Sequence, residues 1–214
     1  MKKIISMAVA AVLLVSATFA LDLEVGGRGI LGRNLDEGFK EEYAKAKDEG
    51  TFDYGFGVYG NFALLGGLGI QAEANYITSH VDFKMKDDQG NPSTLKYDIS
   101  TLDLSPMLWL NLDLWKFTVG LGAGPNFSIQ LPALSDVKTA TKDQFTTGLV
   151  AGADFKFYLT DHLGLVLSGR YITEFHKKDV EIEVAGYGTG QSYQTFDIGR
   201  KTFYGGIGLE WKLL

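Results

Sequence analysis

The stretch Phe117-Thr-Val-Gly-Leu-Gly-Ala-Gly-Pro-Asn-Phe-Ser-Ile129 alternates strictly between two kinds of residue. Its odd-numbered positions are apolar or aromatic, and its even-numbered positions are small or polar without charge. A period of two is that of a β-strand, whose successive side chains point to opposite faces. A face without charge is unusual where it meets water but suits the narrow interior of a small barrel. The stretch therefore predicts a strand whose apolar side faces lipid and whose small side faces a lumen.

Seven other stretches alternate in the same way, and each has about the length that a tilted strand needs to cross a bilayer. They run over residues 21–31, 52–62, 68–81, 99–110, 144–157, 163–175 and 202–213. Short turns are predicted at Leu64–Gly67, Asn111–Leu114 and Tyr158–His162, whereas the other connections, such as 33–51 and 176–200, are long and polar. This layout indicates an all-β, eight-stranded antiparallel up-and-down transmembrane β-barrel with short periplasmic turns and long extracellular loops. A hairpin pattern around Gly186–Gly190 is interpreted as the last two strands continuing above the membrane.

The first twenty residues have the pattern of a secretory signal peptide. Lys2 and Lys3 precede the apolar run Ile4–Val15, and small residues then lead to Ala20. This run is too short for a membrane-spanning helix. We therefore expect residues 1–20 to be a cleaved signal peptide and residues 21–214 to form one barrel domain in the cell outer membrane.

Composition and charge exclude several classes of function. The chain has 214 residues and a formal net charge of −6, with no basic stripe for phosphates, so no nucleic-acid partner is expected. The absence of cysteine excludes disulfides, thiolate metal sites and a cysteine nucleophile. The three histidines, His80, His162 and His176, stand in no pattern that places a base beside a nucleophile. We therefore expect no enzymatic activity, no metal and no cofactor.

The pattern as a whole resembles a known family. The signal peptide, the eight strands, the four long loops and the final run Phe203-Tyr-Gly-Gly-Ile-Gly-Leu-Glu-Trp-Lys-Leu-Leu214 are similar to the small bacterial outer-membrane barrels of the OmpA, OmpX and OmpW type. The resemblance covers the predicted mature chain and implies an eight-stranded barrel. For the OmpW branch it also implies passage of small hydrophobic compounds through the barrel mouth and sideways into lipid.

Five charged residues fall in mid-strand on the predicted inward face: Arg28, Glu73, Asp103, Asp154 and Arg170. An ion in a narrow lumen is costly unless it is paired. We therefore expect the two arginines to pair with the three carboxylates. This network either plugs the lumen or gates a narrow pore, and the small size of an eight-stranded barrel favours the plug.

A second inward group is apolar. Ile30, Ile77 and Ile172 are predicted at similar heights on the long-loop side of the charges, where they would form an apolar mouth. Pro125, and by the same reasoning Pro106, interrupts the hydrogen bonds of its strand. These interruptions could open a lateral gap between two strands.

Three functions remain open on the sequence. The preferred one is a structural or adhesive outer-membrane protein, monomeric and surrounded by outer-membrane lipid, with a plugged lumen and loops 33–51 and 176–200 contacting host or surface ligands. The second is a narrow channel for ions or small hydrophobic molecules. The third is a soluble periplasmic carrier with its apolar face turned inward.

Overall fold

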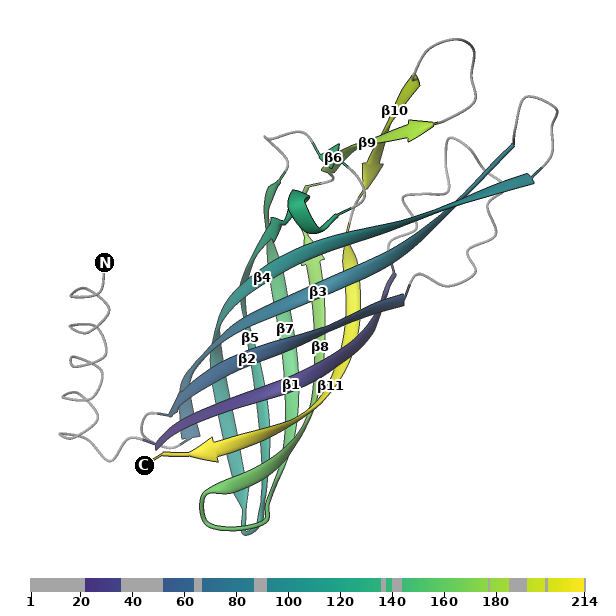
Figure 1. Ribbon diagram of the computed structural model, residues 1–214. Helices are drawn as coiled ribbons and strands as arrows, with labels where there is room; N and C mark the ends of the chain where they lie inside the picture. The colour runs from purple at the N-terminus through teal and green to yellow at the C-terminus, as the bar shows by residue number, and fades with distance from the viewer. Residues whose placement is uncertain are drawn as a thin grey trace.

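The computed structural model describes residues 22–35, 52–63, 67–86, 92–135, 138–139, 144–176, 178–184, 192–198 and 200–213. Figure 1 shows tilted strands wound into a barrel, with a small sheet beyond one end. Eight antiparallel strands close the barrel in the order β1-β11-β8-β7-β5-β4-β3-β2, which confirms the predicted fold. These strands are β1 (Asp22–Asn34), β2 (Phe52–Ala63), β3 (Leu68–Lys86), β4 (Pro92–Leu114), β5 (Phe117–Gln130), β7 (Phe145–Tyr158), β8 (Leu163–Glu174) and β11 (Lys201–Lys212).

The two faces of the strands differ as their alternation predicts. On β5, Asn126 and Ser128 are fully buried in the lumen, whereas Leu121 is exposed on the outer wall. Leu108 and Ile207 on this wall are exposed to 68% and 70%. A continuous wall of large apolar side chains is suited to hydrocarbon and not to water. The alternative of a soluble carrier with its apolar face inward is therefore wrong. Among the described residues, no helix has the length and apolarity needed to span a membrane.

The boundaries of two strands and one turn differ from the prediction. β3 and β4 extend beyond 68–81 and 99–110 on the long-loop side and stay paired as far as Lys86 and Pro92. β4 also continues through the predicted turn at 111–114, so that the chain reverses at Trp115 and Lys116 instead. Trp115 has a φ of 60°, a conformation that favours glycine, and its side chain is 89% exposed.

The hairpin predicted in the last connection forms, but it does not continue the barrel strands. β9 (Lys178–Val184) pairs with β10 (Ser192–Ile198), and β6 (Lys138–Thr139) pairs with β9, which gives a separate three-stranded sheet. A short 3-10 helix, η2 (Pro132–Leu134), follows β5. In Figure 1 the small sheet lies beyond the long-loop end of the barrel. The predicted signal peptide and most of the connection 33–51 lie outside the described residues.

Candidate functional site

The middle of the lumen is filled by four charged side chains, here called the central cluster: Arg28, Glu73, Asp154 and Arg170. One oxygen of Glu73 contacts Nη2 of Arg28, and the other accepts hydrogen bonds from Nη2 and Nε of Arg170 at 2.5 and 2.9 Å. Arg170 also donates to Asp154, with distances of 2.7 Å from Nη1 to Oδ1 and 3.1 Å from Nη2 to Oδ2. All four residues are buried. Two positive charges therefore meet two negative charges away from water.

Neutral side chains add hydrogen bonds to Glu73 and Arg28 in this cluster. Gln71 donates from Nε2 to Glu73 at 2.7 Å. Asn75 donates from Nδ2 to the same carboxylate at 3.2 Å, and its Oδ1 accepts from Arg28 at 3.2 Å. Glu73 thus has partners on two arginines and two amides. These hydrogen bonds hold the Glu73 carboxylate in place, because the loss of any one of them leaves a buried polar group unpaired.

Trp109 fills the lumen beside the central cluster. The guanidinium carbon of Arg170 lies 4.9 Å from the centre of the indole ring, a distance at which the ring attracts a cation. The ring has space because Gly120 and Gly122 lie opposite it on β5, where any added side chain would overlap the indole. Gly120 and Gly122 on the inner face of β5 are therefore explained by one large side chain on β4.

The fifth predicted residue, Asp103, does not pair with Arg28 or Arg170, so this part of the predicted network is wrong. Asp103 instead accepts two hydrogen bonds from Arg200, at 2.7 Å from Nη1 to Oδ1 and 2.8 Å from Nη2 to Oδ2. Glu174 lies 3.7 Å from the same guanidinium. Burial opposes the charge of Arg200, but Asp103, Glu174 and Asp53 together outweigh this effect and raise the pKa of the guanidinium above its ordinary value. The sequence reading missed Arg200 because it assigned this residue to a polar loop.

A further charged group closes the short-turn end of the lumen. Lys156 donates to Glu24 at 2.5 Å and contacts Glu210 at 2.8 Å. The hydroxyl of Tyr158 lies 2.7 Å from Glu24 and 2.9 Å from Glu210. Since a hydroxyl carries one proton, it can donate to only one of these carboxylates at a time. Lysine and tyrosine together hold the two acids near each other.

Ile30, Ile77 and Ile172 do not form an open mouth. Their exposed fractions are 1%, 0% and 0%, and they belong to one buried apolar cluster. Ile30 and Ile172 each follow an arginine of the central cluster by two residues, on strands that run toward the long-loop end. Arg200 lies at the long-loop start of β11. The three isoleucines are here called the apolar layer. Arg200 stands two residues beyond Ile172 toward the long-loop end of the paired strands β8 and β11, so the mouth that the sequence suggested is closed.

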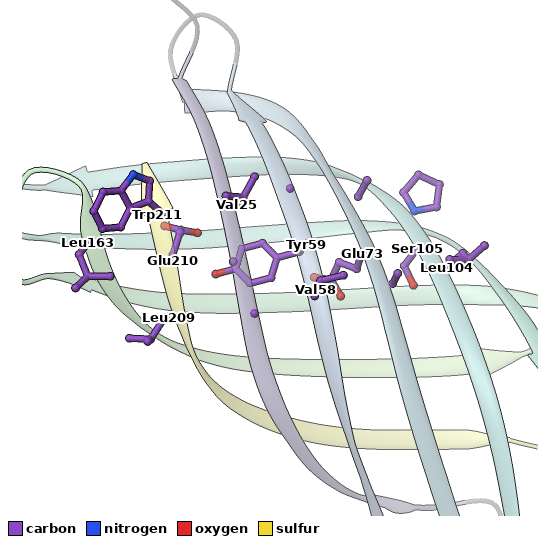
Figure 2. Close-up of a pocket in the computed structure, with 16 residues that line it drawn as sticks. Val25, Val58, Tyr59, Glu73, Leu104, Ser105, Leu163, Leu209, Glu210 and Trp211 are labelled. Carbon is purple, nitrogen blue, oxygen red and sulfur yellow. The ribbon is translucent and has the colours of Figure 1, made fainter. Parts of the chain in front are cut away.

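The outer wall carries a shallow apolar groove of about 860 Å³. Figure 2 shows the larger side chains that line it from β1, β2, β4 and β11, among them Val25, Val58, Leu104 and Leu209. Small residues between them leave the depression, including Gly27, Gly60 and Ala72. The groove belongs to the lipid-facing wall, so acyl chains are its ordinary surroundings.

The ladder between β4 and β5 is interrupted beside this groove. The three residue pairs around Pro106 and Pro125 are missing from an otherwise continuous register. A proline has no backbone N–H to donate to its partner strand. The strands nevertheless stay close. The space at Gly124 is so narrow that a side chain there would overlap the Pro106 backbone, and the Ser105 hydroxyl donates a hydrogen bond to Asn126 at 2.7 Å. The predicted interruption is therefore a closed seam with few backbone hydrogen bonds.

The described histidines lie away from the lumen. His80 contacts Asp98, and both side chains are partly exposed at the long-loop end. His162 stacks on Trp211 with ring centres 6.0 Å apart, at the short-turn end. Among the described residues, no group of three or more histidine or acidic side chains is placed to hold a metal ion.

Comparison with known proteins relates this architecture to a family. Residues 7–197 match the family described as outer membrane protein beta-barrel domain. A comparison with curated proteins finds no match. Among solved structures, the outer membrane protein OprG from Pseudomonas aeruginosa is 18% identical, with a TM-score of 0.66 over 90% of this chain and 95% of that chain.

Two further solved structures have the same fold. A major outer membrane protein from Thermus thermophilus is 13% identical, with a TM-score of 0.54 over 91% of this chain and 100% of that chain. Neisserial surface protein A is 9% identical, with a TM-score of 0.50 over 89% of this chain and 97% of that chain. At such identities the likeness concerns the fold, and the match over most of the sequence gives the family. This chain belongs to the outer membrane protein beta-barrel domain family.

Proposed function

We propose that the protein is a non-conducting outer-membrane scaffold whose long extracellular connections contact surface ligands. The observation that carries the proposal is the filled lumen. Three charged groups and one apolar layer fill it, and in each charged group the arginine or lysine side chains pair with carboxylates. A permeating ion would have to displace these buried contacts, which is costly in a low-dielectric interior.

The parts that project beyond the barrel support a surface role. β3 and β4 run as a paired ribbon past the barrel end, and the β6–β9–β10 sheet lies at the same end (Figure 1). Binding functions concentrate on loops held by a rigid scaffold. We infer a structural or adhesive, non-enzymatic role for a monomer surrounded by outer-membrane lipid, with host or surface ligands bound at connections 33–51 and 176–200.

Conductance in planar bilayers tests the plugged lumen. The natural chain should give no discrete channel steps, and Glu73→Ala and Arg170→Ala should lose stability without gaining a channel. Discrete steps from the natural chain would contradict a scaffold. Steps that appear only in the variants would indicate that the central cluster is a gate.

Adhesion tests the surface role separately. Residues 178–198 are replaced by a short glycine-serine linker, and the matched control carries a glycine-serine replacement of residues 159–161 in a periplasmic turn. Bacteria producing equal amounts of each chain are compared for attachment to host cell layers. Attachment should fall only with the first replacement. Equal attachment of both would argue against these loops as the contact surface.

A second candidate function is sideways passage of small hydrophobic molecules, and the interrupted ladder at Pro106 and Pro125 is the observation that favours it. Trp109 is fully buried in the lumen and reports on entry when Trp115→Phe and Trp211→Phe remove the other two tryptophans. Passage predicts saturable quenching by a small terpene, slowed by Pro106→Ala with Pro125→Ala. An unchanged Trp109 signal at saturating terpene would remove this candidate.

A further inference from the structure

Three carboxylates surround a single guanidinium at the extracellular end of the lumen. Asp53 comes from β2, Asp103 from β4 and Glu174 from the end of β8, and Arg200 precedes β11. Asp53 and Asp103 have exposed fractions of 0%, the Glu174 side chain is 0% exposed and the Arg200 side chain is 7% exposed. This group, called the outer cluster, therefore carries three potential negative charges and one positive charge.

The hydrogen-bond acceptors of the outer cluster are arranged to bind a guanidinium group. Arg200 makes two nearly parallel hydrogen bonds to Asp103, at 2.7 and 2.8 Å, which is the fork arrangement that carboxylates offer to this group. The Ser128 hydroxyl accepts a third hydrogen bond from Nη1 at 3.2 Å, and Thr202 accepts one from Nε at 3.3 Å. Donors thus meet acceptors from β4, β5 and β11.

Among the described residues, Asp53 is the acid of this cluster that forms no ion pair with Arg200. Neither carboxylate oxygen of Asp53 accepts a hydrogen bond of ordinary length, although the side chain is fully buried. The Ser79 hydroxyl lies beside the Asp53 carboxylate, and both Arg200 and Asp103 lie within its electrostatic range. A buried carboxylate that no cation contacts directly is costly, because its hydration is lost and little replaces it. The surroundings of Asp53 therefore favour a positively charged group.

The cation that occupies the cluster is attached to a connecting segment rather than to a barrel strand. Arg200 stands two residues after the last residue of β10 and directly before β11. Its backbone carbonyl accepts a hydrogen bond from the Glu174 N–H at 2.9 Å, so the main chain is held while the side chain alone reaches the acids. Rotation of one side chain would empty the cluster without unfolding a strand.

We propose that Asp53, Asp103 and Glu174 form a binding site for the guanidinium or primary ammonium group of an external ligand, which Arg200 occupies as a tethered substitute. The described residues around it offer no grouping for a metal ion, and the paired hydrogen bonds of Asp103 match a planar fork. Binding of an external cation displaces the Arg200 side chain. Because Arg200 stands beyond Ile172 at the extracellular end of the lumen, its displacement exposes the apolar layer to the extracellular side.

Cysteine labelling measures this displacement, since the natural chain has no cysteine. Ile172→Cys places a thiol in the apolar layer, and the refolded chain in lipid vesicles is treated with the small neutral reagent methyl methanethiosulfonate. The thiol should react slowly. Adding Arg200→Ala should speed labelling by at least about a hundredfold, because deleting one partner of a buried ion pair is strongly destabilising and here removes the closure. Unchanged protection would overturn the proposal.

Chemical rescue then tests the site itself. Guanidinium chloride at millimolar concentration, far below denaturing levels, should restore slow labelling in the Arg200→Ala chain, whereas equal sodium chloride should not. The matched control carries Asp103→Asn as well and should show no rescue. Labelling that stays fast with guanidinium, or rescue that persists without the Asp103 carboxylate, would overturn the proposal.

The natural Arg200 provides an independent measurement if Arg200→Ala fails to reach the folded, heat-modifiable form. In the Ile172→Cys chain, agmatine should accelerate labelling in a saturable manner as it competes with Arg200. Equal sodium chloride should have little effect. The absence of any agmatine effect would overturn the proposal.

Discussion

Glu73→Gln should destabilise the barrel more than any other conservative change in the central cluster. The substitution keeps the shape of the side chain. Among the described residues, it removes the only carboxylate that Arg28 contacts and one of the two that Arg170 contacts. Arg28 keeps its hydrogen bond to Asn75 at 3.2 Å, and the new amide oxygen can still accept from one of the two arginines, but it carries no charge and its NH2 group faces the other arginine. Two buried guanidinium groups would share a single carboxylate, that of Asp154.

The expected loss follows from that imbalance. Removing one partner of a buried ion pair costs about 3–5 kcal/mol, because a charge is left without compensation. Asp154→Asn should cost less, since Arg170 retains Glu73 at 2.5 Å. Glu73→Gln should therefore lower the free energy of unfolding by about 3–5 kcal/mol, clearly more than Asp154→Asn.

Urea unfolding of the refolded chain in lipid vesicles provides the measurement, followed by tryptophan fluorescence and by heat-modifiable gel mobility. A double-mutant cycle gives the control. Arg28→Ala and Glu73→Ala should be strongly coupled, whereas Arg28→Ala and Asp103→Ala should add to within about 0.5 kcal/mol, because Asp103 belongs to the outer cluster. Equal losses for Glu73→Gln and Asp154→Asn, or strong coupling between Arg28 and Asp103, would refute this reasoning.

Three further predictions concern the glycines, the strained turn and the lipid wall. Gly122→Ala should destabilise by about 1–3 kcal/mol because the methyl group meets Trp109, whereas Gly169→Ala, with open space around it, should be neutral or stabilising in the same urea assay. Trp115→Gly should be more stable than Trp115→Ala by about 1 kcal/mol, since glycine adopts the positive φ without strain; equal stabilities would show that the turn rearranges. Leu121→Arg should cost about 2–4 kcal/mol on the lipid face, and a nitroxide at Leu121 should be relaxed by dissolved oxygen rather than by aqueous reagents; relaxation by aqueous reagents would contradict a lipid-facing wall.

The barrel could be predicted because lipid and lumen impose opposite demands on alternate residues. Leu121, which is apolar and exposed on the outer wall, and Asn126, which is polar and buried in the lumen, are examples of this alternation. The extensions of β3 and β4 were missed because a ribbon beyond the membrane has no lipid-facing side to impose the alternation. The turn was misplaced because Asn111 and Asp113 are typical turn residues, yet both belong to β4.

The sequence allowed us to predict which inward residues are charged and must pair, but not every one of their partners. Mid-strand ions on the inward face must pair, and Arg28 and Arg170 both contact Glu73. Which residues meet across the lumen depends on the stagger between strands, and the sequence does not show that stagger. Asp103 therefore has a different partner. Arg200 lies outside any alternating run, so no sequence signal placed it in the lumen.

The positions of Glu24 and Arg28 have a consequence for assembly. Both belong to β1, while their partners Lys156 and Glu73 belong to β7 and β3 on other sides of the cylinder. Detaching β1 would open the barrel between β2 and β11. It would also remove Arg28 from Glu73 on β3 and Glu24 from Lys156 on β7. We therefore expect closure of the barrel and neutralisation of these two interior charges to occur together during assembly.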